Sequence, residues 1–491
     1  MRSAIKKIFW LYALIFLILI GYLLKLCLYD SHSFVANPFN PRLSQSYEGI
    51  KRGSIYDSNG DVIAEDVKQD DGTFKRVYKN ARYYAHVVGY TVKGKAGVES
   101  KYNFRLESIN NEFLQRVGNL FLGKDIEGNS LVLTIDNRLQ EIAGEELGNQ
   151  RGSIVAMEPS TGKILAMVSN PAFDSNTVAE NWEELNSDDK NSPLLNRATQ
   201  GLYPPGSTFK IITAAAALEA DKALESFEID CDGEEKFGHS IIHCYNGKAH
   251  GNVNMDSAFA KSCNIYFSEI GVKIGAGKLI DMAYAFGFNK DIGLSLEYSK
   301  STFPMTLEAE ENEIVETSFG QGRTLVTPLF MAMVTSAVAN NGMMMQPYVV
   351  DHSLTPSGGV RNRTLPVKLN QAISPGLASQ IKELMCGVVE NNGGTAQNAS
   401  FSVSGTAVNY DENESGASVS KGAYSGKIRV AGKTGTAENP QGDDHAWFVA
   451  FAPADEPKIA VAVLLENAGK GSNAIPAARE IMKTYIENLA G

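Results

Sequence analysis

Hydrophobic residues follow three different patterns along the chain. The first is an unbroken apolar run over residues 8–24, preceded by a basic N-terminal segment. About 20 apolar residues are enough to span a bilayer, and basic residues mark the cytoplasmic end of a membrane helix. This pattern predicts a cytoplasmic tail over residues 1–7 and a single transmembrane anchor over residues 8–29. The run is too long for the core of a cleaved signal peptide, so we expect the anchor to be retained.

The second pattern consists of short apolar runs between turn residues. Residues 51–62 read as a strand, a turn at Asn59-Gly60 and a second strand, and residues 137–147 read as an amphipathic helix. No segment between residues 30 and 150 combines a nucleophile with a base. We therefore interpret residues 30–150 as a small β-rich pedestal domain of the dimerisation or interaction type.

The third pattern begins at residue 151. Two apolar strands, 152–157 and 163–169, form a hairpin, and three further apolar strands lie between residues 427 and 467. The helical patterns fall between these two groups, apart from a closing helix near the C-terminus. Strands at both ends imply one shared sheet covered by the helices, so residues 151–491 are predicted to form an α/β domain of the α+β type.

Composition and charge narrow the class of function. The 491 residues include 43% hydrophobic and 21% charged residues, as folded globular proteins do. The formal net charge of -11 supplies no basic stripe that could follow phosphates, so nucleic acid is not an expected partner. The link to a membrane rests on the N-terminal apolar run alone.

The strongest chemical candidate is the stretch from Tyr203 to Lys210. Two prolines and a glycine end any preceding helix, and the apolar run after Lys210 predicts a buried helix that begins near Ser207. Residues three apart share one face of a helix, so the Ser207 hydroxyl and the Lys210 amine can meet. This is the arrangement of a serine nucleophile with a lysine base.

Two further motifs give this pattern a context that it lacks alone. Ser-x-x-Lys recurs by chance at Ser3, Ser160, Ser187, Ser379 and Ser418. Ser262-Cys263-Asn264, however, lies in a helix-rich block, and Lys433-Thr434-Gly435-Thr436 lies on a late strand. The three motifs in this order form a strongly specific set.

With these motifs the chain resembles the class B penicillin-binding proteins of the penicilloyl-serine transferase superfamily. Residues 52–57 and 97–99 are similar to motifs of the family's pedestal, and Gly320-Gln321-Gly322 and 445–448 are similar to motifs of its transpeptidase domain. The resemblance implies an antiparallel sheet covered by helices on both faces, with a helical subdomain. It also implies a peptidoglycan D,D-transpeptidase that β-lactams acylate.

The same resemblance implies partners and a location. Peptidoglycan stem peptides would be the substrate, and a polytopic membrane glycosyltransferase would be the protein partner. The catalytic domain would lie outside the bacterial cell membrane. Three features depart from the family's pattern. Ser58 replaces a usual arginine, and Cys263 occupies a position that is often serine. The polar stretch 401–426 looks like an exposed insertion of little periodicity.

Within the resemblance, the first two motifs have expected catalytic roles. Ser207 attacks the carbonyl between two D-alanines, Lys210 accepts its proton, and Ser262 passes the proton to the departing amine. Asn264 holds a substrate amide and orients Lys210. The backbone N–H groups of Ser207 and Thr436 are expected to form the oxyanion hole.

The third motif is expected to bind the end of the substrate peptide, through Lys433, Thr434, Gly435 and Thr436. Its glycines would let a ligand backbone approach closely. Burial, the helix N-terminus and a positively charged Lys433 should lower the pKa of Lys210, so Lys210 is expected to be neutral and Lys433 charged. No metal or cofactor is expected.

The five cysteines are interpreted as too few and too scattered for a disulfide framework or a zinc-ligand spacing. Cys231 and Cys244 flank a short polar segment, and the residues leave open whether they form one disulfide or remain two thiols. Cys263 is interpreted as a packing residue.

Other functions remain open on the sequence. If water replaced the acceptor amine, the enzyme would be a D,D-carboxypeptidase or a β-lactamase, although no segment resembles the additional glutamate loop of class A β-lactamases. The chain could instead be a β-lactam sensor or a scaffold for a glycan polymerase, and neither function requires transfer of an acyl group to an amine. The sequence does not distinguish roles in elongation, division or sporulation.

Overall fold

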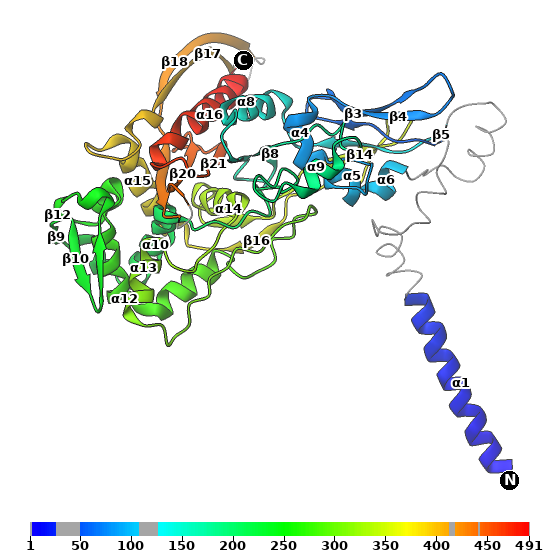
Figure 1. The fold of residues 1–491 in the computed structure, drawn as a ribbon, viewed down its shortest axis with the longest axis horizontal. Helices are drawn as coiled ribbons and strands as arrows, with labels where there is room; N and C mark the ends of the chain where they lie inside the picture. The colour runs from blue at the N-terminus through cyan, green and yellow to red at the C-terminus, as the bar shows by residue number, and fades with distance from the viewer. Residues whose placement is uncertain (1, 26–49, 108–125, 412–417, 440–441, 491) are drawn as a thin grey trace.

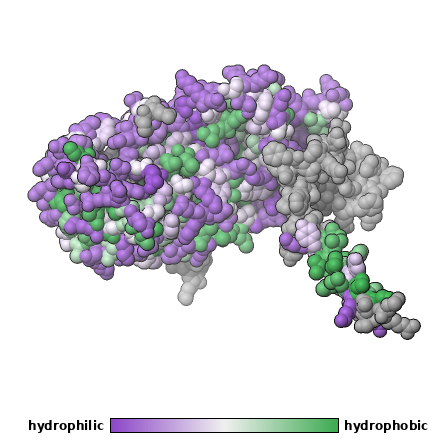
Figure 2. Space-filling model, turned by 60° about the horizontal axis from the view of Figure 1, so that its bottom comes forward, coloured by the Kyte–Doolittle hydropathy of each residue, from purple (hydrophilic) through white to green (hydrophobic). Residues whose placement is uncertain are grey.

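A computed structural model describes residues 2–25, 50–107, 126–411, 418–439 and 442–490. Helix α1 (Arg2–Lys25) stands apart from the rest of the chain, and Figure 2 shows it as a hydrophobic rod beside a mostly polar surface. Its segment Ile5–Lys25 is long and apolar enough to cross a membrane, and none of its most apolar window is buried. The predicted end of the anchor, residues 26–29, lies outside the described residues.

The central sheet has five strands, antiparallel throughout, in the order β19-β20-β21-β7-β8. The strands are β7 (Gly152–Met157), β8 (Ile164–Asn170), β19 (Ala431–Ala437), β20 (His445–Ala452) and β21 (Ile459–Leu465). The prediction that both ends of the domain contribute to one sheet is confirmed. β19 lies at the edge of this sheet, which leaves its other side open to an extended ligand.

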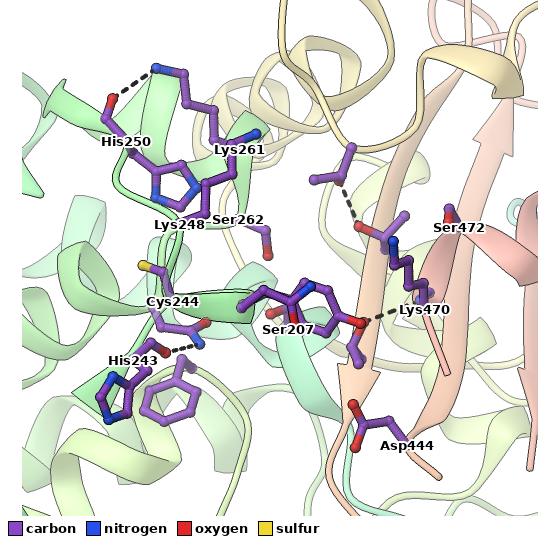
Figure 3. Close-up of a pocket in the computed structure, with 18 of the residues that line it drawn as sticks. Ser207, His243, Cys244, Lys248, His250, Lys261, Ser262, Asp444, Lys470 and Ser472 are labelled. Atoms are coloured by element: carbon purple, nitrogen blue, oxygen red, sulfur yellow. Dashed lines mark hydrogen bonds between the residues drawn. The ribbon is translucent and has the colours of Figure 1, made fainter. Parts of the chain in front are cut away.

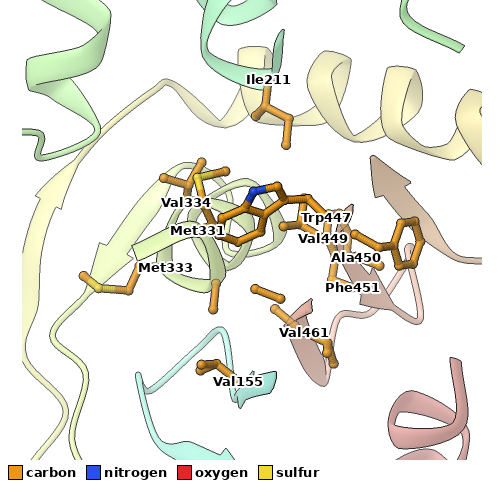
Figure 4. Packing of buried hydrophobic residues seen from close by; sticks show 14 of the residues in the cluster. Val155, Ile211, Met331, Met333, Val334, Trp447, Val449, Ala450, Phe451 and Val461 are labelled. Atoms are coloured by element: carbon orange, nitrogen blue, oxygen red, sulfur yellow. The ribbon is translucent and has the colours of Figure 1, made fainter. Parts of the chain in front are cut away.

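Helices cover both faces of the sheet (Figure 1). On one face α14 (Pro328–Ala339) packs against β7, β20 and β21. Its N-terminus is fixed by Thr327, whose side chain accepts the N–H of Phe330, and by proline at the first position. On the other face lie α8 (Asn137–Leu147) and α16 (Ile475–Ala490), which contact each other and the sheet. Figure 4 shows Met331 and Val334 of α14 among buried residues that include Trp447 and Val449 of β20.

A helical subdomain adjoins the edge strand β19. Its helices are α10 (Lys210–Ala220), α11 (Met255–Lys261), α12 (Asn264–Ala285) and α13 (Glu311–Ser318). Two small antiparallel pairs accompany them: β9 (Ile229–Cys231) with β12 (Gly251–Val253), and β10 (Glu234–Phe237) with β11 (Ser240–His243). Helix α15 (Pro375–Glu390) contacts β19, α10 and α11, and so connects the sheet to the subdomain.

The pedestal contains a six-stranded sheet in the order β15-β14-β6-β2-β3-β4. Four strands come from the predicted pedestal: β2 (Ile55–Tyr56), β3 (Val62–Lys68), β4 (Phe74–Tyr78) and β6 (Ser130–Leu133). The other two, β14 (Val350–Leu354) and β15 (Val360–Arg361), come from the part of the chain after residue 150. This sheet therefore joins the two halves, which a division of the chain at residue 150 does not anticipate.

The polar stretch 401–426, interpreted as an exposed insertion of little periodicity, contributes the two strands of a long hairpin. β17 (Phe401–Asp411) pairs antiparallel with β18 (Ser418–Ile428). Backbone hydrogen bonds hold such a ladder together, so it can form without the apolar alternation that a sequence pattern detects.

Candidate active site

Ser207 lies in a tight turn, the 3-10 helix η2 (Gly206–Phe209), which leads into α10. The helical turn begins at Gly206 and continues as α10 from Lys210, which agrees with a helix that begins at or near Ser207. Within this first turn the Thr208 hydroxyl donates to the Pro205 oxygen at 2.6 Å. Gly206 has a φ of 53°, and a Cβ there would lie 2.7 Å from the Thr436 oxygen. Only glycine lets the nucleophile turn approach β19 this closely.

The Lys210 amine lies at the centre of the site. Its Nζ is 3.1 Å from Ser207 Oγ and 3.3 Å from Ser262 Oγ. It also donates to two carbonyl oxygens, the Ser262 backbone at 2.8 Å and Asn264 Oδ1 at 2.7 Å. The structure thus brings the first two motifs together around one amine.

The second motif occupies the break between α11 and α12. Ser262 ends α11 in the left-handed conformation, with a φ of 59°, and Asn264 begins α12. The Asn264 amide donates to the His243 oxygen at 2.9 Å, which directs its own oxygen toward Lys210. This break, rather than a continuous helix, turns the serine hydroxyl and the asparagine amide toward the same amine.

The third motif brings a second buried lysine to Ser262. Lys433 Nζ donates to Ser262 Oγ at 2.9 Å and to the Thr434 oxygen at 3.0 Å. Lys210 and Lys433 are both fully buried. Within the part of the chain that the structure describes, neither lysine lies within ion-pair distance of a carboxylate.

Burial dominates the electrostatics of this pair. It lowers the pKa of Lys210 to about 8, which overcomes the upward effect of the nearby Cys263 and Cys244 sulfurs. It lowers the pKa of Lys433 well below its usual value, and the charge of Lys210 adds to that effect. Burial thus disfavours the charge of both amines: it lowers the pKa of Lys210, as expected, and it also lowers the pKa of Lys433, which the expectation of a charged Lys433 did not include.

The glycine and threonine of the third motif have different surroundings. A Cβ on Gly435 would lie 2.9 Å from Thr208 Cγ2 and 3.1 Å from the Pro205 oxygen. The glycine thus admits the nucleophile turn, whereas we expected it to admit the ligand backbone. Thr436 lines the cavity, and its hydroxyl accepts the N–H of Gly471 at 3.1 Å.

A cavity of about 620 Å³ opens above these residues (Figure 3). Its lining includes Ser207, Ser262, Asn264, Thr434 and Thr436 from the predicted site. Sequence reasoning missed further lining residues, which belong to no motif: Thr395, Lys470, Gly471, His243, Cys244 and His250. Thr395 meets the Thr434 hydroxyl at 2.6 Å, a contact between distant segments that no local pattern could reveal.

The cysteines contradict the interpretation that they are too scattered for metal ligands. Cys231, Cys244 and Cys263 are free, buried thiols, so the alternative of two thiols holds for the first pair. Together with His250 they place four ligand atoms within 4.8 Å of one another. Cys263 is therefore part of a cluster of ligating side chains, and not merely a packing residue.

Comparison with known proteins agrees with this geometry. A penicillin binding protein transpeptidase domain matches residues 152–484, and a penicillin binding protein A dimerisation domain matches residues 52–131. The chain is 36% identical over 464 residues to the peptidoglycan D,D-transpeptidase PbpA of Mycolicibacterium smegmatis, covering 88% of this chain and 87% of that protein.

Solved structures show the same relationship. The imipenem acyl-enzyme complex of penicillin-binding protein A from M. tuberculosis superimposes with a TM-score of 0.77 at 33% identity, covering 89% of this chain and 99% of that one. The D,D-transpeptidase domain of a peptidoglycan glycosyltransferase from Eggerthella lenta also gives a TM-score of 0.77 at 33% identity, over 90% and 99% of the two chains. The chain therefore belongs to the penicillin-binding protein transpeptidase family.

Proposed function

We propose that the protein is a membrane-anchored serine D,D-transpeptidase that cross-links peptidoglycan stem peptides through an acyl-enzyme on Ser207. One observation carries the proposal. Two carbonyl oxygens accept hydrogen bonds from Lys210, so a neutral amine would direct its lone pair toward Ser207 Oγ, 3.1 Å away. A base aimed at a nucleophile is what acyl transfer requires. The acyl-enzyme structure of the similar mycobacterial protein supports the same chemistry.

The reaction would proceed in two acyl transfers. Ser207 Oγ attacks the carbonyl carbon of the penultimate D-alanine, and its proton passes to Lys210. The backbone N–H groups of Ser207 and Thr436 would hold the oxyanion. The carbon–nitrogen bond then breaks, and Ser262 relays the proton to the departing D-alanine amine. An acceptor amine attacks the resulting ester, forms the cross-link and returns a proton to Ser207.

Binding of the substrate would favour the protonated form of Lys433. The terminal carboxylate, bound by Lys433, Thr434 and Thr436 at the open edge of β19, would bring a negative charge next to a buried amine. That charge raises the pKa of Lys433, and a charged Lys433 in turn lowers the pKa of Lys210. Substrate binding would thus prepare the base.

The remaining proposals concern location and organisation. Helix α1 would anchor the protein in the bacterial cell membrane with its N-terminus in the cytoplasm, because the basic residues precede the apolar run. Residues 30–150 would serve as the pedestal and residues 151–491 as the catalytic domain. A polytopic membrane glycosyltransferase is the proposed partner. Cleavage of the catalytic domain by protease added to intact spheroplasts would support this orientation, and complete protection would contradict it.

Labelling by a fluorescent penicillin tests the nucleophile. The full chain in detergent should be labelled covalently, and Ser207→Ala should not, while both give the same circular dichroism spectrum. Label that persists in Ser207→Ala would place the nucleophile elsewhere. β-Lactam labelling together with release of D-alanine, but no dimer in the presence of acceptor peptide, would make the enzyme a carboxypeptidase.

A further inference from the structure

A buried carboxylate, Glu466, follows β21 and does not line the catalytic cavity. Two arginines face it: Arg197 Nε lies 2.7 Å from Oε1, and Arg151 Nε lies 2.9 Å from Oε2. Oε1 also accepts a hydrogen bond of 2.7 Å from the Tyr203 hydroxyl. We propose that Glu466 is a positioning residue, which holds through Tyr203 the turn that presents Ser207 for acylation. The inference rests on the proposed acyl transfer at Ser207 and adds a residue to it.

The ion pairs fix the carboxylate that Tyr203 contacts. Arg197 is 1% exposed, and its two terminal nitrogens donate to the Ser192 oxygen at 3.1 Å and the Asn191 oxygen at 2.6 Å. Burial alone would raise the pKa of Glu466, but Arg197 and the hydrogen bond from Tyr203 hold it below its usual value. Glu466 is therefore ionised, and a hydrogen bond to a charged acceptor is stronger than one between neutral groups.

Tyr203 is the residue through which this cluster contacts the nucleophile turn. Its ring is closely packed, because a Cβ on Gly201 would lie 2.5 Å from the ring atom Cε2. Its backbone pairs with Val326 through N–H···O bonds of 2.9 and 2.8 Å. The carbonyl oxygen of the next residue, Pro204, accepts the indole N–H of Trp447 at 3.0 Å. The ring, the backbone and the hydroxyl are thus all held only four residues before the nucleophile.

Glu466 also begins the segment that reaches the other side of the site. Its N–H donates to the Arg151 oxygen at 2.7 Å, which continues the pairing of β21 with β7. Further along this segment, the Gly471 N–H donates to the Thr436 hydroxyl at 3.1 Å. The backbone N–H groups of Ser207 and Thr436 form the proposed oxyanion hole. Glu466 is therefore connected to both sides of it, through its side chain to the turn and through its backbone to Thr436.

A purely structural ion pair is the alternative. A buried arginine requires a carboxylate wherever it lies, but that requirement does not involve a tyrosine. The Tyr203 hydroxyl is the part of the cluster that belongs to the nucleophile turn, and its removal leaves both ion pairs in place. Acyl transfer is sensitive to such a loss, since a displacement of about 1 Å can slow a reaction about 10²-fold. The acylation rate therefore separates the two roles.

Tyr203→Phe tests the positioning role in the full chain in detergent, because it keeps the ring and removes only the hydroxyl. The limiting rate constant of penicillin acylation, measured by stopped-flow, should fall about tenfold, while the half-saturating concentration changes less than about twofold. The control is Tyr84→Phe, which removes a buried pedestal hydroxyl that donates to Asn137 Oδ1 at 3.0 Å and should leave both constants unchanged. A limiting rate in Tyr203→Phe within about twofold of the wild type, or an equal fall in Tyr84→Phe, would overturn the proposal.

Glu466→Gln tests the route through Tyr203. Glutamine keeps an acceptor for the hydroxyl but not the charge, so acylation should slow, and in the Tyr203→Phe background the same change should slow it no further. Additive effects on the limiting rate would overturn this route. If Glu466→Gln does not fold because Arg197 is left without a counter-charge, Tyr203→Phe alone decides the proposal. A wild type that penicillin does not acylate would overturn the proposed function and this inference together, whereas normal acylation of the wild type and of Tyr203→Phe would overturn this inference alone.

Discussion

The pedestal and the active site both bury basic side chains, but only the pedestal pairs them with a buried carboxylate. In the pedestal the fully buried Glu99 lies 2.7 Å from Arg52 and 2.7 Å from Arg76. Burial alone would raise the pKa of Glu99, yet the two arginines hold it below its usual value. In the active site, Lys210 and Lys433 are buried against neutral oxygens, and burial lowers the pKa of both.

The arginines of the pedestal are permanently charged, whereas the charge of the buried lysines can change near neutral pH. Arginine stays protonated in proteins and binds carboxylates with fixed geometry, so the pedestal cluster can act as a rigid joint. A lysine amine loses its proton readily when buried without a counterion. A general base must do this near neutral pH, so an unpaired buried amine suits the catalytic site.

Removing the amine of Lys210 should have the largest effect. Lys210→Met keeps an unbranched side chain out to Cε but has no base, so penicillin acylation should slow by about 10³-fold. The rate is measured by stopped-flow or by timed labelling of the full chain. The unfolding midpoint serves as the control for folding. An acylation rate within tenfold of the wild type would mean that another group accepts the Ser207 proton.

Removing the charge of Glu99 should instead affect stability. Glu99→Gln leaves two buried arginines without their shared carboxylate, which should lower the free energy of unfolding by about 3–5 kcal/mol. Urea titration in detergent measures the change. The matched control is Glu127→Gln, which breaks the more exposed Lys51–Glu127 pair of 2.9 Å and should cost less than about 1 kcal/mol.

The acylation rate of the folded fraction of Glu99→Gln should match the wild type, because Glu99 has no contact with the catalytic amines. Equal unfolding energies for the two variants would mean that the buried cluster is no stronger than a surface pair. A slower acylation rate would show that the pedestal also shapes the active site.

These two regions also show where sequence reasoning succeeds and where it fails. The three motifs identified the residues around Lys210, because each one combines residue chemistry with a local helix or strand signal. The local signals could not give contacts between distant segments, such as β14 with β6, Thr395 with Thr434, or Cys244 with Cys263. The lowered pKa of Lys433 was not anticipated for a related reason, since desolvation depends on every element that packs around an amine.

The pH dependence of acylation sharpens the contrast in protonation. The pKa of Lys210 is lowered to about 8, so the neutral base is lost as the pH falls below that value. Penicillin acylation should therefore decrease about tenfold per pH unit between pH 7 and pH 6 and level off above pH 9. A flat profile between pH 6 and pH 9 would contradict a titrating base.

Pedestal stability should not change over the same range. The lowered pKa of Glu99 means that its contribution is present above its ordinary pKa of about 4.3 and is lost only as the pH falls through the folded value. The unfolding midpoints of the wild type and Glu99→Gln, measured between pH 6 and pH 9, should keep a constant difference.

The smallest expected effect on acylation comes from the contact between the Thr395 and Thr434 hydroxyls, next to Lys433. Thr395→Val keeps the shape of the side chain but removes the 2.6 Å contact with the Thr434 hydroxyl. The Thr395 N–H still donates to the Ala260 oxygen at 3.1 Å, so the backbone should stay in place. One lost neutral hydrogen bond is worth about 1 kcal/mol, which corresponds to about fivefold slower second-order acylation.

The loss in Thr395→Val should appear in β-lactam affinity and not in the chemical step, because Thr434 is proposed to bind the carboxylate and does not contact Lys210. Thr335→Val removes a buried hydroxyl on α14 that donates to Met331, so it should change stability but leave acylation alone. In a double-mutant cycle, Thr395→Val and Thr434→Val should be non-additive. Additive effects would mean that the two hydroxyls act independently, and that Thr395 does not position Thr434 for the substrate carboxylate.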